Sequence, residues 1–100
     1  MVKTSYQLRA KVWLYPGMAA WHFVTLPRGQ SSEIKKRFGM MSGGFGSLPV
    51  VVTIGKTSWK TSIFPDKKAG AYLLPLKADV RKREHIRVGD MVSFVVEIRV

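Results

Sequence analysis

The last third of the chain, GAYLLPLKADVRKREHIRVGDMVSFVVEIRV (residues 70–100), decides the fold class. An apolar strand over residues 71–74 is followed by a basic helical turn over residues 78–85. Gly89-Asp90 predicts a turn, and residues 91–100 then alternate between apolar and polar side chains. This alternation predicts a half-buried strand, because successive side chains of a strand point to opposite faces of the sheet.

The upstream chain contains the same kind of element. Alternation and β-branched or aromatic residues predict four further strands, at residues 4–15, 20–26, 48–54 and 57–64. Pro16-Gly17 separates the first two strands and Gly55-Lys56 separates the last two, so each pair is expected to form an antiparallel hairpin.

A first helix is predicted over residues 28–39. Ser31 or Ser32 has the short polar side chain that suits an N-cap, and a glycine at the end suits a C-cap. Ile34 and Phe38 lie four residues apart, so they would share the face that packs on the barrel.

About six short strands and two helices too small to cover a flat sheet predict a mainly β fold. The fold class is a closed or nearly closed six-stranded pseudobarrel capped by the two short helices. Closure would also remove exposed edges from these apolar strands. No repeat or linker interrupts the pattern, so we expect a single small β-barrel domain over residues 1–100.

Charge is the compositional outlier. The chain has 17 Lys and Arg against 6 Asp and Glu, a net charge of +11, which would attract a polyanion such as nucleic acid. The sequence has no cysteine, no apolar run long enough to span a bilayer and no apolar segment typical of a secretory signal near its start. We therefore expect a soluble cytoplasmic protein with no membrane partner.

A family resemblance rests on motifs spread along the chain. They are Trp21-His22-Phe23-Val24-x-Leu26-Pro27, Gly55-Lys56-x-x-Trp59-x-x-Ser62, Gly70-x-Tyr72-x-Leu74-Pro75-Leu76-Lys77-x-x-Val80-Arg81 and Ile86-x-x-Gly89-Asp90-x-Val92. In these motifs the chain resembles a bacterial and archaeal family of small barrels catalogued as a domain of unknown function. Members of that family occur alone or fused to a bacteriocin-protection-type domain. The resemblance implies a six-stranded pseudobarrel akin to the double-split barrels of AbrB- and MazE-type transcription factors, and it brings no established activity.

Catalytic residue patterns are sparse. The two histidines, His22 and His85, have no partner at metal-ligand spacing, and the six carboxylates form no obvious acid–base pair. We therefore expect a non-enzymatic protein without a metal or a cofactor. Gly89 and Asp90 are expected to act structurally, through a positive φ and a carboxylate that accepts hydrogen bonds from backbone N–H groups.

The basic cluster is the first candidate site. It comprises Lys77, Arg81, Lys82, Arg83 and Arg87, with Lys67 and Lys68 just before it in the sequence. If the helix turns Val80 inward, these cations would project from one end of the barrel and contact phosphate groups. The alternative is an ordinary solvated helix face, in which Asp79–Arg83 could pair.

The second candidate site is aromatic and comprises Trp21, His22, Trp59 and Ser62. Aromatic side chains beside cations can stack on the bases of single-stranded nucleic acid. They can equally line a small-ligand pocket, form a homodimer interface or simply fill the core. The predicted function is therefore that of a small basic, non-enzymatic binding module for a polyanion such as nucleic acid. The alternative is a small-ligand or protein-interaction barrel with an aromatic-lined pocket.

Overall fold

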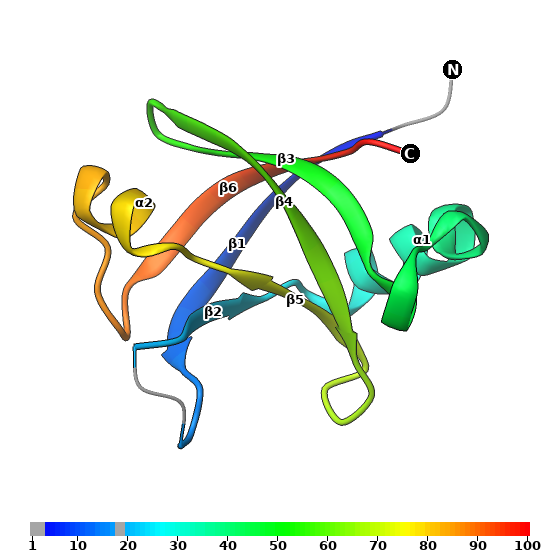
Figure 1. Cartoon of the computed structure of the whole chain (residues 1–100), viewed down its shortest axis with the longest axis horizontal. Coiled ribbons are helices and arrows are strands. Elements are labelled where there is room, and N and C mark those ends of the chain that lie inside the picture. Colours follow the sequence, from blue (N-terminus) through cyan, green and yellow to red (C-terminus); the bar gives the residue numbers. More distant parts are fainter. Residues whose placement is uncertain (1–3, 18–19) are drawn as a thin grey trace.

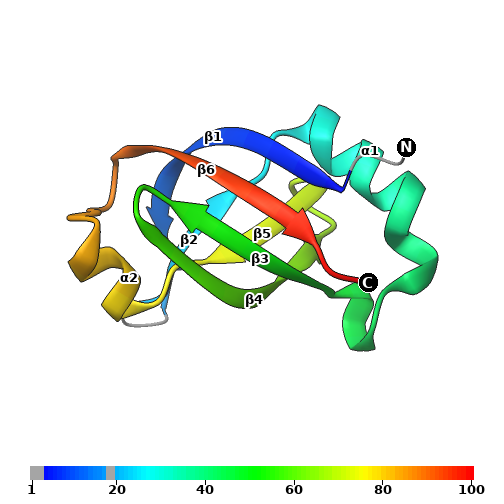
Figure 2. The ribbon, with the colours of Figure 1, turned by 90° about the horizontal axis from the view of Figure 1, so that it is seen from above.

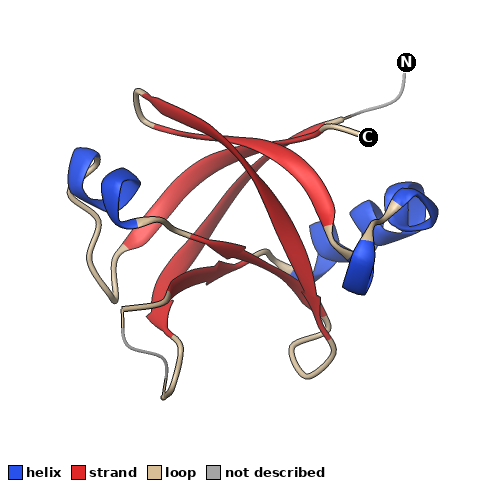
Figure 3. Ribbon diagram, viewed as in Figure 1, coloured by secondary structure: helices blue, strands red, loops and turns tan. Residues whose placement is uncertain are grey.

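The computed structural model describes residues 4–17 and 20–100. The expectation that the chain lacks a secretory signal near its start falls partly on Met1–Lys3, which lie outside the described residues. The described chain is mainly β, with a barrel placed between two short helices (Figure 1, Figure 3).

Six strands close the barrel in the order β1-β2-β5-β4-β3-β6, and every neighbouring pair is antiparallel. The strands are β1 (Ser5–Leu14), β2 (His22–Thr25), β3 (Leu48–Ile54), β4 (Thr57–Asp66), β5 (Ala71–Pro75) and β6 (Met91–Ile98). The closed six-stranded barrel predicted from the sequence is confirmed.

Two long strands hold the barrel together. β1 pairs with β6 along residues 5–11 and with β2 along residues 12–14, and β4 pairs with β3 along residues 57–63 and with β5 along residues 64–66. Each long strand therefore pairs with one neighbour along its first part and with another along its last part. Figure 2 shows the curved paths of β1 and β4. Because β2 pairs with β5, the two shortest strands lie side by side on one wall.

Alternate residues of each strand fill the interior. The fully buried strand residues include Tyr6, Val12, Val24, Val52, Leu74 and Val96. This packing is what alternation predicts for a barrel of this size, in which side chains occupy the whole lumen.

The first helix, α1 (Arg28–Phe38), covers one barrel end and buries Ile34 and Phe38 as predicted. Its N-cap is Pro27, so the predicted Ser31 or Ser32 cap is wrong. Ser31 is instead buried, where its hydroxyl donates to Leu26 O and accepts from the backbone N–H of Tyr72. A serine that links α1 to β5 is not available to cap the helix.

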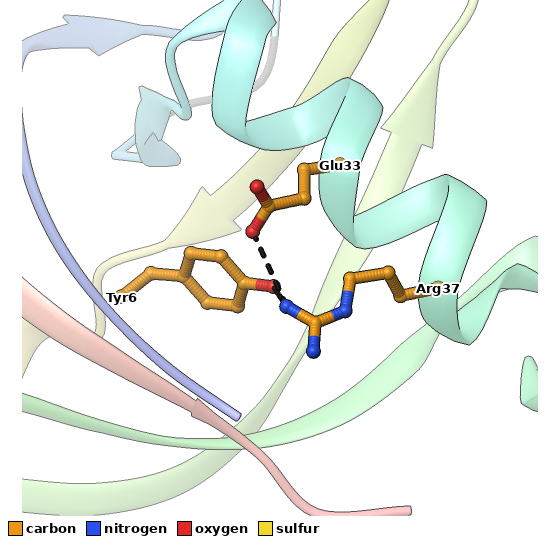
Figure 4. A network of polar contacts seen from close by, with 3 residues as sticks. All are labelled: Tyr6, Glu33 and Arg37. Atoms are coloured by element: carbon orange, nitrogen blue, oxygen red, sulfur yellow. Dashed lines mark hydrogen bonds and ion pairs between the residues drawn. The ribbon is translucent and has the colours of Figure 1, made fainter. Parts of the chain in front are cut away.

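Polar contacts attach α1 to β1. The Arg37 guanidinium lies 3.4 Å from Tyr6 Oη and 3.5 Å from the Glu33 carboxylate, and Figure 4 shows the three side chains converging. Burial of Tyr6 and the nearby Glu33 carboxylate raise the pKa of the tyrosine phenol.

The second helix, α2 (Ala78–Arg83), is shorter than the predicted 78–85. His85 adopts a left-handed conformation with φ of 55°, and the N–H of Ile86 donates to Arg81 O at 2.9 Å. This hydrogen bond is the Schellman ending of a helix, which usually requires glycine at the left-handed residue. Val80 and Ile86 are both buried, so the ending also anchors α2 on the barrel.

Strand boundaries also differ from the sequence prediction. β1 and β2 are shorter than residues 4–15 and 20–26, β4 continues through Pro65 and Asp66, β5 includes Pro75, and residues 99–100 lie beyond β6. Between α1 and β3, residues 40–46 lie largely within two 3₁₀ turns, Gly39–Met41 and Gly44–Gly46. Hydroxyl groups of Ser42 and Ser47 donate to backbone carbonyls inside this segment, which gives it local order without helical periodicity.

Candidate functional site

A groove of about 760 Å³ lies on the outer wall of the barrel, where β2, β5 and the start of α2 meet. Its lining is mostly apolar, and it includes three basic side chains, those of His22, Lys77 and Arg81. The lining residues are Ala20, Trp21, His22, Phe23, Phe64, Leu73, Pro75, Leu76, Lys77, Ala78 and Arg81. The groove therefore combines residues from both candidate sites predicted from the sequence.

The cationic side of the groove is held by hydrogen bonds. Arg81 Nε donates to Leu76 O at 3.1 Å, and Arg81 Nη1 lies 3.5 Å from His22 Nε2. The backbone N–H of Leu76 donates to His22 O at 2.9 Å. This hydrogen bond connects the start of β2 to the residue that follows β5, and both of these residues contact Arg81. Lys77, beside it, is exposed.

The aromatic side of the groove belongs to a larger cluster on β1 and β2. Phe23 packs against Trp13 with ring centroids 5.3 Å apart and against Trp21 at 6.2 Å, and Tyr15 lies 5.8 Å from Phe23. Trp13 Nε1 donates to Thr25 Oγ1, which fixes its ring. Trp21 is 54% exposed, so its ring is supported by Phe23 and still open to solvent.

Trp59 and Ser62 do not join this groove. Trp59 packs against the core, and its Nε1 is buried without a hydrogen-bond partner among the described residues. Ser62 lies three positions after Trp59 on β4, so the two side chains point to opposite faces of the strand. The prediction that the strands carrying Trp21-His22 and Trp59-Ser62 line one cavity is therefore wrong.

The basic cluster is only partly brought together. Lys77 and Arg81 line the groove, whereas Lys82, Arg83 and Arg87 are exposed and do not. Residues 77–90 contain five cations and three carboxylates, a net charge of +2, so +9 of the total +11 lies elsewhere in the chain. The cluster is therefore not the main concentration of positive charge.

The carboxylates of α2 and its C-cap accept hydrogen bonds from uncharged groups. Asp79 accepts from the backbone N–H of Val80, and Glu84 accepts from the Thr57 hydroxyl at 2.6 Å. The predicted Asp79–Arg83 ion pair is absent from the described part of the chain, whose ion pairs are Arg37–Glu33 and Arg99–Glu97. The cations of α2 thus have no paired carboxylate there.

The lysines that precede the cluster in sequence lie away from α2. Lys67 lines a smaller recess of about 290 Å³ together with Ser32 and Lys35 of α1. Strand β5 runs between the Lys67–Lys68 turn and α2, so closeness in sequence does not bring these lysines to the groove.

Gly89 and Asp90 form the turn between α2 and β6. Gly89 has a φ of 92°, and Asp90 Oδ2 accepts from the backbone N–H of Arg87 at 2.8 Å. The backbone groups of Gly89 and Asp90 also bond to those of Val12 on β1. These contacts give both residues a structural position in the closure of the barrel.

Most of the groove wall was not among the candidate site residues predicted from the sequence, including Phe64, Leu73 and Pro75. Phe64 faces outward, and it is the apolar exception on the otherwise polar face of residues 58–64. The run Tyr72-Leu73-Leu74-Pro75 lacks alternation, which signals that both faces of β5 are covered with apolar side chains. These two signals together could have located the wall.

Among the described residues, no three His, Cys, Asp or Glu side chains gather in a way that could hold a metal ion. Neither α1 nor α2 has the length and the apolar character needed to cross a membrane, and no other described helix does.

These features define a small closed antiparallel β-barrel with an aromatic and cationic groove on its outer wall. Residues 9–96 match the family model described as a domain of unknown function, DUF1905, and the chain belongs to this family. The resemblance to a small-barrel family of unknown function, predicted from the sequence motifs, is thereby confirmed. A search of curated proteins finds no match.

Proposed function

We propose that this barrel is a non-enzymatic binding module that engages single-stranded nucleic acid in the groove beside α2. The observation that carries the proposal is the position of the exposed Trp21 ring in the same groove as Lys77 and Arg81. An aromatic face and two cations at one place match the two parts of a nucleotide, its base and its phosphate.

The energetics of such binding are favourable. Stacking of one base on an aromatic side chain contributes about 1–3 kcal/mol and tolerates any base. Cations bind the phosphates and fix the position of the strand without reading its sequence. The net charge of +11, most of it outside residues 77–90, would attract the strand from a distance.

The proposal includes three wider expectations. The barrel is taken to be akin to the double-split barrels of AbrB- and MazE-type transcription factors, which supports a nucleic-acid ligand. A cytoplasmic location would give access to such a ligand. A homodimer would place two grooves on one strand, which raises the overall affinity through effective concentration.

Fluorescence anisotropy with a labelled oligothymidylate of about 15 nucleotides, at about 150 mM salt, tests the proposal. We expect the protein to bind more tightly than an equally basic control protein, and Trp21→Ala to weaken binding about tenfold. Leu14→Ala is the matched control, since Leu14 is also exposed and apolar but lies outside the groove. The proposal would be contradicted if the Trp21→Ala and Leu14→Ala variants bound with equal affinity. It would also be contradicted if the unaltered protein bound no more tightly than the control protein.

A second candidate function is the binding of a small anionic ligand with an apolar body. The groove volume of about 760 Å³ lies in the range of pockets that hold drug-sized molecules. If this function is the correct one, a mononucleotide should raise the melting temperature of the protein in a concentration-dependent way. The oligonucleotide should then bind the protein no more tightly than it binds the equally basic control protein.

A further inference from the structure

Arg81 carries a charge that the protein itself does not neutralise. Its side chain is half-buried, and its two hydrogen-bond acceptors, Leu76 O and His22 Nε2, are both uncharged. In the described ranges, residues 4–17 and 20–100, no carboxylate lies within ion-pair distance of this guanidinium. A fixed cation on an apolar wall is a strong site for an anion, because the surroundings screen its charge less than water does.

His22 sets the orientation of this guanidinium. His22 Nδ1 lies 2.8 Å from Ala20 O, and because a carbonyl oxygen only accepts, Nδ1 carries the proton. Arg81 Nη1 can only donate, so its contact with the other ring nitrogen, Nε2, makes Nε2 the unprotonated acceptor. Ala20 has a φ of 65°, an unusual conformation for a residue with a side chain, and its carbonyl is directed at the ring.

The remaining donors of Arg81 define the ligand. A guanidinium has five N–H donors, and the bonds to Leu76 and His22 use two of them, which leaves three on Nη1 and Nη2. A planar pair of such donors suits the two oxygens of a phosphate or a carboxylate. The neighbouring Trp21 ring suits a flat aromatic group, and a phosphate joined to an aromatic ring system through a sugar is a nucleotide.

We infer that Arg81 selects the phosphate of a nucleotide unit whose base stacks on Trp21, and that His22 is the residue that positions Arg81. This inference rests on the proposed function and narrows it to one residue. It separates Arg81 from Lys82 and Arg83, which carry the same charge on the same helix but lie outside the groove. The phosphate can belong to a strand or to a free nucleotide, and the experiment below distinguishes the two.

The first arm of the test compares a charge-conserving variant of Arg81 with charge-removing variants of its helix neighbours in the oligothymidylate assay. We expect Arg81→Lys to weaken binding about tenfold, because lysine keeps the charge but loses the planar pair of donors. Lys82→Ala and Arg83→Ala should each weaken binding by only about twofold. The inference is overturned if the protein binds the strand and Arg81→Lys behaves like Lys82→Ala, and the proposed function then still stands.

The second arm tests the positioning role. His22→Phe keeps a ring but has no acceptor for Arg81, so we expect a loss close to that of Arg81→Lys. His22→Gln restores an acceptor and should return the affinity to within about twofold of the original. A purely structural role for His22 would give equal losses in both variants, and that result would overturn the positioning role.

The third arm needs no variant, so it is unaffected by any folding defect. Adenosine monophosphate and adenosine are each titrated against the unaltered protein and followed by NMR. We expect the phosphorylated compound to bind at least about tenfold more tightly, because adenosine lacks the group that Arg81 holds. Equal binding overturns the inference. Binding of the mononucleotide without binding of the oligonucleotide overturns the proposed function and leaves the phosphate-selecting role of Arg81 supported.

Discussion

Two tryptophans that the sequence assigns to one candidate site have opposite positions in this barrel. Trp59 packs against the core, whereas Trp21 is 54% exposed beside the groove. Alternation along residues 57–64 already assigns Trp59 to the face of Ile63 and Ser62 to the other face. The sequence therefore contained the reason that Trp59 and Ser62 do not form one site, although it gave no sign that Trp21 and Arg81 would meet.

Trp59 also supports a prediction about stability. Its indole Nε1 is buried without a partner among the described residues, which is an energetic cost. Trp59→Phe removes this donor and keeps an aromatic ring, so we expect the free energy of unfolding to change by less than about 1 kcal/mol. Trp59→Ala should lose about 3 kcal/mol, because it leaves a cavity. Chemical denaturation measures both, and an equal loss in the two variants would mean that Nε1 has a partner.

The elements themselves were largely predictable, and their ends were less so. Strand alternation and the Gly55-Lys56 turn identify the hairpins, because these signals are local. The N-cap of α1 was mispredicted because Ser31, a good N-cap residue in isolation, is used in a tertiary contact with Tyr72. The end of α2 was mispredicted because the left-handed position is occupied by His85, not by the glycine that usually signals it.

The Schellman ending of α2 gives a prediction at the scale of the element. His85 has a φ of 55°, which is unfavourable for a residue with a side chain. We expect His85→Gly to raise the free energy of unfolding by about 0.5 kcal/mol, since glycine adopts this conformation readily but gains freedom in the unfolded chain. Lys82→Gly, inside the helix, should instead lower it by about 1 kcal/mol. Similar losses from both substitutions would contradict the Schellman ending.

At the scale of the whole molecule, the sequence indicated a closed barrel but not its groove. Closure follows from the number and apolarity of the strands, and the structure confirms it. The groove depends on β2 pairing with β5 and β5 with β4, which are contacts between segments far apart in the sequence. No local pattern encodes that neighbourhood, so Phe64 and Trp21 could not be assigned to one wall from the sequence alone.

Alkaline pH should weaken the barrel as a whole. Burial raises the pKa of Tyr6, with a further contribution from Glu33, and burial raises the pKa of Tyr72. The folded state therefore favours the protonated phenols, and their contribution to stability is complete below pH 10 and lost as the pH rises through the raised pKa values. We expect the free energy of unfolding to fall above about pH 10, and to fall less steeply in a Tyr6→Phe, Tyr72→Phe double variant.

Denaturation curves at several pH values check this expectation. The double variant is first compared with the unaltered protein at pH 7, where the phenols are protonated, so that packing losses are measured separately. Parallel pH profiles for the two proteins would contradict the assigned role of the buried tyrosines.

The most direct measurement of the central claim is an NMR titration of the ¹⁵N-labelled protein with the unlabelled oligothymidylate. The account predicts that the signals of the Trp21 indole, the Arg81 guanidinium Nε–H and the backbone N–H groups of Leu73 and Lys77 shift together and saturate. The indole signal of the core residue Trp59 should stay in place. Shifts confined to α1 and the Lys67–Lys68 turn, or no shifts at all, would contradict the claim that this groove is the binding site.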